Sequence, residues 1–229
     1  MADRLPVPGS QGLTVVLKRS ARARRMTLRV ARTDGGVALT LPRGVPLAQA
    51  RAFVAEQAEW IARHVAAAPP PRRAAPGATL PFEGREVPVQ ACDGRAARWT
   101  GAALAVPDDA RAGPRLAAFL REAARARLTS AVDRHAAAIG RAPGRITLRD
   151  TRSRWGSCTA RGDLMFSWRL VMAPPDVLDY VAAHEVAHLV HMDHSTRFWA
   201  QVETLMPGWR ARRAWLRREG AGLHAIRFD

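Results

Sequence analysis

Short apolar runs alternate with polar and turn residues over the first forty or so positions of the chain, a pattern typical of β-strands. Three strands are predicted there, at 13–17, 26–30 and 37–41. The residues Asp34-Gly35-Gly36 precede the third strand and predict a turn, because glycine readily adopts the positive φ that tight turns require.

A helical pattern of apolar positions begins at Pro46 and continues to about His64. The Pro/Ala-rich stretch that follows, 66–77, has no period and predicts a connector. Beyond it, residues 80–90 and 97–106 predict a β-hairpin around Asp93-Gly94.

The second half of the chain is mainly helical. Apolar residues at helical spacing from Pro114 to about Ile139 predict one long amphipathic helix. The later elements are predicted as strands at 145–150 and 164–171, a helix that follows Pro174-Pro175 and ends near His191, and helices at 195–205 and 208–218. The whole pattern predicts an α+β fold.

Two parts are expected along the chain. A β-rich N-terminal part with one helix is predicted over 10–110. A core over 111–229 is predicted to consist of a backing helix, a small antiparallel sheet and the helix that follows Pro174-Pro175.

Composition excludes several classes of protein. Apolar residues make up 48% and charged residues 24% of the 229 residues, which is ordinary for a globular protein. No apolar run is long enough to predict a transmembrane helix, and the N-terminal residues have no secretory signal pattern. Cys92 and Cys158 are the only cysteines, too few for a disulfide framework or a four-cysteine zinc site, so we expect a cytoplasmic protein.

The net charge of +16 suggests a polyanionic partner, but its distribution weakens that suggestion. Residues 1–150 have a net charge of +13, residues 151–200 have none and residues 201–229 have +3. Lys18 is the only lysine, which suggests that codon bias accounts for part of the arginine content. Nucleic acid is therefore a possible partner that the charge alone does not establish.

The helix after Pro174-Pro175 contains the sequence His184-Glu185-Val186-Ala187-His188, an HExxH motif. Residues four apart share a helix face, so both imidazoles can bind one Zn²⁺. Glu185 is rotated by about 100° around the helix and can reach a water activated by the metal, as a general base does. The strand 164–171 is expected to be an edge strand that pairs with an extended substrate, with Trp168 on it.

An open catalytic zinc site needs a third protein ligand, and three residues are candidates. His191 shares the face of His184, but a continuous helix would place it about 10 Å further along the axis. His194 can reach the metal if the helix ends and the chain turns before it, and Ser195 can then cap the next helix. We favour His194, keep Glu203 as the alternative and interpret His191 as a polar residue at a helix end.

These residues and their surroundings resemble the YgjP-like metallopeptidases, a zincin family related to the SprT-like and Wss-type proteases. The matching residues are Arg154-Trp155-Gly156-Ser157-Cys158, Ser167-Trp168-Arg169-Leu170, Ala173-Pro174-Pro175, Val177-Leu178-Asp179-Tyr180-Val181, the HExxH motif, His194-Ser195 and Phe198-Trp199. The resemblance covers about 13–223, and its specific part is 152–199.

The resemblance implies a zincin-like catalytic core with one Zn²⁺ per chain. It implies that His184, His188 and His194 bind the metal and that Glu185 is catalytic. The function expected is hydrolysis of a peptide or amide bond in a peptide or protein substrate. Two alternatives are a nucleic-acid-associated metalloprotease acting on DNA-bound proteins and a non-catalytic binding module in which zinc only staples the fold.

Overall fold

The computed structural model describes residues 3–31 and 35–229, so Asp34 of the expected turn lies outside the described residues. The chain divides into two compact units, Met1–Pro71 and Arg72–Asp229. This boundary lies in the predicted connector and differs from the expected one at 110/111. The physical reason is that the strands between 79 and 106 bury their apolar side chains in the same core as the long helix that follows them.

Over residues 3–31 and 35–71, the N-terminal unit contains one sheet and two helices. Its strands are β1 (Arg4–Pro6), β2 (Thr14–Ser20), β3 (Thr27–Val30) and β4 (Val37–Pro42). They are ordered β1-β2-β4-β3, with β2 and β4 parallel and the other pairs antiparallel. The single helix expected from Pro46 to His64 is divided at Gln57 into α1 (Leu47–Glu56) and α2 (Ala58–Ala66).

A second four-stranded sheet lies in the first part of the C-terminal unit. Its strands are β6 (Thr79–Phe82), β7 (Arg85–Ala91), β8 (Arg98–Trp99) and β9 (Leu104–Val106), ordered β6-β7-β9-β8. The predicted hairpin around Asp93-Gly94 is wrong, because β7 pairs with β9 in parallel. The tight turn lies instead at Glu83-Gly84, where both residues have positive φ, as a two-residue hairpin turn requires.

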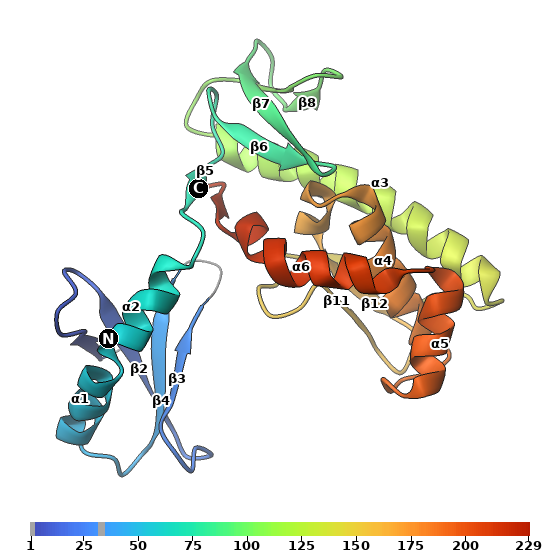
Figure 1. Ribbon diagram of the computed structural model, residues 1–229. Coiled ribbons are helices and arrows are strands. Elements are labelled where there is room, and N and C mark those ends of the chain that lie inside the picture. The colour runs from blue at the N-terminus through green and yellow to red at the C-terminus, as the bar shows by residue number, and fades with distance from the viewer. Residues whose placement is uncertain (1–2, 32–34) are drawn as a thin grey trace. The chain divides into compact units, whose positions relative to one another are not determined.

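The core of the C-terminal unit surrounds helix α4 (Pro175–Ala187). This helix contacts α3 (Ala112–Ala138), α5 (Thr196–Leu205), α6 (Trp209–His224) and strand β11 (Gly156–Cys158), so it is enclosed on several sides (Figure 1). The helices at these positions confirm the predicted order of elements. The last strand, β13 (Ile226–Arg227), pairs in parallel with β5 (Arg72–Arg73) and ties the C-terminus to the start of the unit.

The small sheet of this core differs from the prediction in two ways. It is mixed rather than antiparallel, with the order β10 (Ile146–Arg149), β12 (Leu164–Ser167), β11 and with β10 parallel to β12. The predicted strand 164–171 ends at Ser167 and continues as a 3₁₀-helix, η1 (Trp168–Met172). β12 is therefore the central strand and β10 and β11 are the edge strands, so the predicted edge position of 164–171 is wrong. Trp168 is buried within the core and does not face a substrate.

A buried arginine joins this sheet region to the C-terminal end of α6. Arg169 donates hydrogen bonds from Nε and Nη2 to the two carboxylate oxygens of Asp150, at 2.6 and 3.0 Å. Its Nη1 donates to the backbone oxygens of Leu223 and Ile226. Such a bidentate arginine fixes geometry as well as charge, so it holds the C-terminal end of α6 against the sheet region.

No helix in the described parts of the chain is long and apolar enough to cross a membrane.

Candidate metal centre

Helix α4 starts with a proline that suits a helix N-terminus and then runs through the apolar core. Pro175 occupies the first helical position, where the fixed φ of proline is compatible with a helix and its missing N–H is not needed. Most side chains of α4 are buried, Glu185 among them. The helix therefore places the HExxH motif inside the protein.

The helix ends within the motif. Its last residue is Ala187, and His188 is the C-cap. The chain then turns back, and the backbone N–H of Ser195 donates to Oδ1 of Asp193 at 3.1 Å. Ser195 caps α5 by accepting the backbone N–H of Phe198 at 3.4 Å. This turn returns His194 to the two histidines of the motif.

His184, His188 and His194 form a cluster whose possible ligand atoms all lie within 4.8 Å of one another. Nε2 of His184 and Nε2 of His194 are 3.3 Å apart. Two ligand nitrogens bound tetrahedrally to one Zn²⁺ at about 2.0–2.1 Å would be about 3.3–3.4 Å apart, so this spacing fits a shared zinc ion.

The imidazoles are held in this arrangement by their neighbours. Nδ1 of His188 lies 2.9 Å from the backbone oxygen of His191, which orients the ring and leaves Nε2 for a metal ion. The ring of Phe198 stacks on His188 at 4.4 Å and meets His184 edge-on at 4.9 Å. The chemistry of three pre-positioned imidazoles suits a divalent zinc-like ion.

The other two candidate ligands lie outside the cluster. Glu203 accepts the backbone N–H of Gly208 at 3.0 Å and a hydrogen bond from Nη1 of Arg210 at 3.3 Å, so it caps the turn before α6. His191 contributes its backbone oxygen, as described above, and its side chain does not belong to the group of three. The structure thus brings His194, rather than Glu203 or His191, to the motif.

Burial shapes the electrostatics of this centre. Burial, followed by the neighbouring His188 and His194, lowers the pKa of His184 to about 3. A neutral imidazole is the form that binds a metal. Burial raises the pKa of Glu185 to about 8, and the positive charge of Arg154 opposes part of this rise. Only 5% of Glu185 is exposed, so its carboxyl group is largely shielded from bulk solvent.

Strand β11 covers the carboxyl group of Glu185 at a glycine. A Cβ atom built on Gly156 would lie 2.5 Å from Oε1 of Glu185 and 2.6 Å from its Cγ, which no real contact permits. The role of Gly156 was not recognised from the sequence, although a glycine within a strand indicates a close approach of another group. The missing side chain of Gly156 thus leaves the space that Glu185 occupies.

The two residues before Gly156 have different surroundings. Trp155 packs against His224 with ring centroids 4.8 Å apart, and Gly220 leaves room for its indole, so Trp155 locks the loop onto α6. Arg154 acts on the site through its charge near Glu185.

Comparisons with known proteins agree with this geometry. A family model described as YgjP-like, metallopeptidase domain, matches residues 24–219, a range that extends over parts of both units and includes Glu185 and the three clustered histidines. Searches of curated proteins and of solved structures found no match.

Proposed function

The chain belongs to the YgjP-like metallopeptidase family, and from that premise we propose that it is a zinc-dependent peptidase with Glu185 as its general base. The observation that carries the proposal is the buried carboxyl group of Glu185 on the same helix as two of three clustered imidazoles. We interpret α3, the mixed sheet and α4 as a zincin-like core around this centre.

The residues divide the chemistry between them. His184, His188 and His194 would hold one Zn²⁺, which when bound acts as a Lewis acid and lowers the pKa of water to about 7. Glu185 accepts the proton of the attacking water on its carboxylate and passes it to the leaving amine. Arg154 favours the charged form of Glu185, and Gly156 leaves room for that carboxylate.

Strand β11 is suited to position the substrate. Within the described residues its recorded strand partner is β12 alone, so its other edge offers backbone groups to an extended peptide. Because β11 also contacts α4, a peptide added to this edge would lie beside Glu185. Peptide or protein is accordingly the substrate class that we propose.

A purely structural zinc site is a weaker interpretation of the same residues. Burying an ionisable carboxyl group costs free energy. A zinc site that only stabilises the fold does not need such a group beside its ligands. The structure therefore favours a catalytic centre over a zinc-stapled binding module.

Removal of the metal tests the proposed function. We expect the purified protein to hydrolyse fluorescence-quenched peptides, to lose this activity after treatment with 1,10-phenanthroline and dialysis, and to regain it with about one equivalent of Zn²⁺ per chain. Circular dichroism of the treated protein controls for unfolding. Full activity in protein shown to be free of metal would contradict the proposal.

A further inference from the structure

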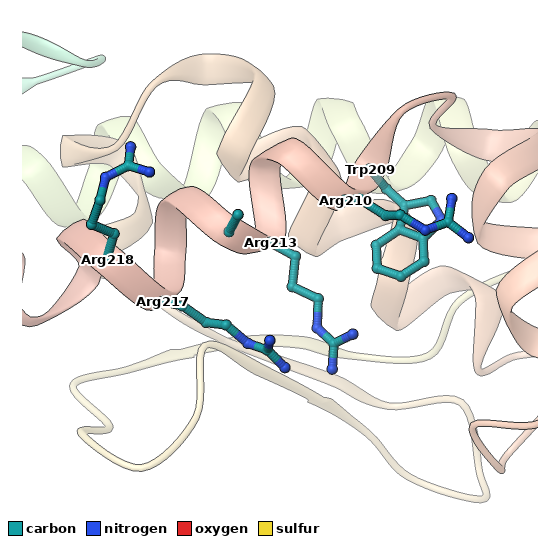
Figure 2. Close-up of a pocket in the computed structure, with 6 residues that line it drawn as sticks. Trp209, Arg210, Arg213, Arg217 and Arg218 are labelled. Carbon is teal, nitrogen blue, oxygen red and sulfur yellow. The ribbon is translucent and has the colours of Figure 1, made fainter.

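One face of α6 carries four arginines that line an open groove. The residues around this groove of about 520 Å³ are Trp209, Arg210, Arg213, Ala214, Arg217 and Arg218. Figure 2 shows Arg213 and Arg217 extending from the same side of the helix, one turn apart. From Arg210 to Arg217 the helix rises by about 10 Å, which equals about three residues of extended peptide.

The groove is joined to the histidine cluster through Trp199. The ring of Trp199 lies 5.6 Å from that of His184 and 5.8 Å from that of His194. On the groove side it stacks on Trp209 at 4.2 Å with an interplanar angle of 17°. The guanidinium carbon of Arg213 lies 4.9 Å from the centroid of Trp199. Trp199 is therefore a shared neighbour of the histidine cluster and of Arg213, which places the arginines next to the candidate metal centre.

Arg213 differs from Arg210 and Arg218 in the groups that its guanidinium contacts, and these contacts suit it to bind an anion. Arg210 is paired with Glu203, and Arg218 with Glu219. In the described part of the chain, the recorded direct contacts of Arg213 are with the indole rings of Trp199 and Trp209. Stacking fixes a guanidinium by its face and leaves the N–H groups at its edge to bind a carboxylate.

The surroundings favour a peptide carboxylate over nucleic acid. Proteins that bind single-stranded nucleic acid offer exposed aromatic faces on which bases stack. Here Trp209 is 5% exposed, because Trp199, Tyr180 and the arginine side chains cover its ring. The groove thus offers positive charge, but Trp209 offers no exposed ring face on which a nucleic-acid base could stack.

We propose that the arginine groove of α6 binds acidic side chains of the substrate, so that the enzyme prefers peptides with Asp or Glu on one side of the cleaved bond; this rests on the proposed peptidase function. The stacked Arg213 is the central determinant of the preference, and Arg217 extends it along the helix.

Binding to full-length protein carrying Glu185→Gln tests this preference without requiring hydrolysis. The probes are a short fluorescent peptide of alternating Glu and Ala, the matching peptide of Gln and Ala, and a single-stranded DNA oligonucleotide of similar length. We expect fluorescence anisotropy to show about 10-fold tighter binding of the Glu peptide than of the Gln peptide, as a charge-assisted hydrogen bond provides.

Arginine variants made in the same Glu185→Gln background locate the binding. Arg213→Gln, and Arg217→Gln as a second variant, should remove most of the difference between the two peptides. Arg125→Gln on α3 removes the same charge from an exposed arginine elsewhere and should preserve it. Thermal melting identifies any variant that fails to fold.

Equal binding of the two peptides, or a difference that persists when both Arg213 and Arg217 are changed, would overturn the proposal. DNA binding that exceeds Glu-peptide binding and is lost in these variants would overturn it in favour of nucleic acid. Because binding is measured in an inactive background, a protein that selects the Glu peptide but whose wild type never hydrolyses peptides would contradict the peptidase function and leave the groove's ligand class intact.

Discussion

Glu185→Gln is expected to lower kcat/KM for peptide hydrolysis by about 10²- to 10⁴-fold, the usual contribution of a general base. Glutamine has nearly the same size, so it fits the space beside Gly156, but its amide cannot accept the proton of the attacking water. The three histidines remain in place, so the variant should still bind about one metal ion per chain. Steady-state kinetics and metal analysis of the same preparation measure both quantities.

Glu203→Gln is the matched control for this change. Glu203 bonds to Gly208 and Arg210 and lies outside the histidine cluster, so the same chemical substitution there should leave hydrolysis close to the wild-type rate. If Glu185→Gln kept wild-type kcat/KM, Glu185 would not be the base and the proposed division of roles would fail.

Gly156→Ala is expected to reduce kcat/KM by about 10²-fold or more, although no catalytic group is removed. The backbone of Gly156 lies outside the left-handed region, so alanine is compatible with its conformation. The added methyl group would nevertheless lie 2.5 Å from Oε1 of Glu185, so either the carboxyl group or β11 must move. A displacement of about 1 Å in a reacting group is enough for an effect of this size.

Stability measurements separate this displacement from unfolding. Overpacking at a core contact typically costs about 1–3 kcal/mol, so Gly156→Ala should remain folded and still bind metal. Gly222→Ala in α6, where a Cβ meets no atom within 4 Å, is the matched control and should keep full activity. Wild-type activity in Gly156→Ala would show that Glu185 is not held against β11 during catalysis.

The local part of the site could be predicted from the sequence. Helical spacing places His184 and His188 on one face, and the same arithmetic disfavours His191 because a continuous helix carries it away. The choice of His194 depends on where α4 ends, and residues able to turn and cap, Asp193 and Ser195, are visible in the sequence.

The long-range part could not be predicted in this way. The parallel pairing of β7 with β9 and of β10 with β12 depends on which strands meet in space, and periodicity within each strand carries no such information. The contact between Gly156 and Glu185 joins residues 29 positions apart. The contact of Arg213 with Trp199 depends on how α5 packs against α6. In the sequence Arg213 belongs to an arginine-rich run that is typical of a solvated helix face.

Metal content tests the central claim most directly, namely that three histidines form the metal centre. The wild-type protein, His194→Ala and Glu203→Ala would be purified side by side, supplied with Zn²⁺, dialysed and assayed by plasma emission spectrometry. About one zinc per chain in the wild type and in Glu203→Ala, with loss in His194→Ala, is the predicted result. Zinc retained in His194→Ala but lost in Glu203→Ala, or no zinc in the wild type, would contradict it.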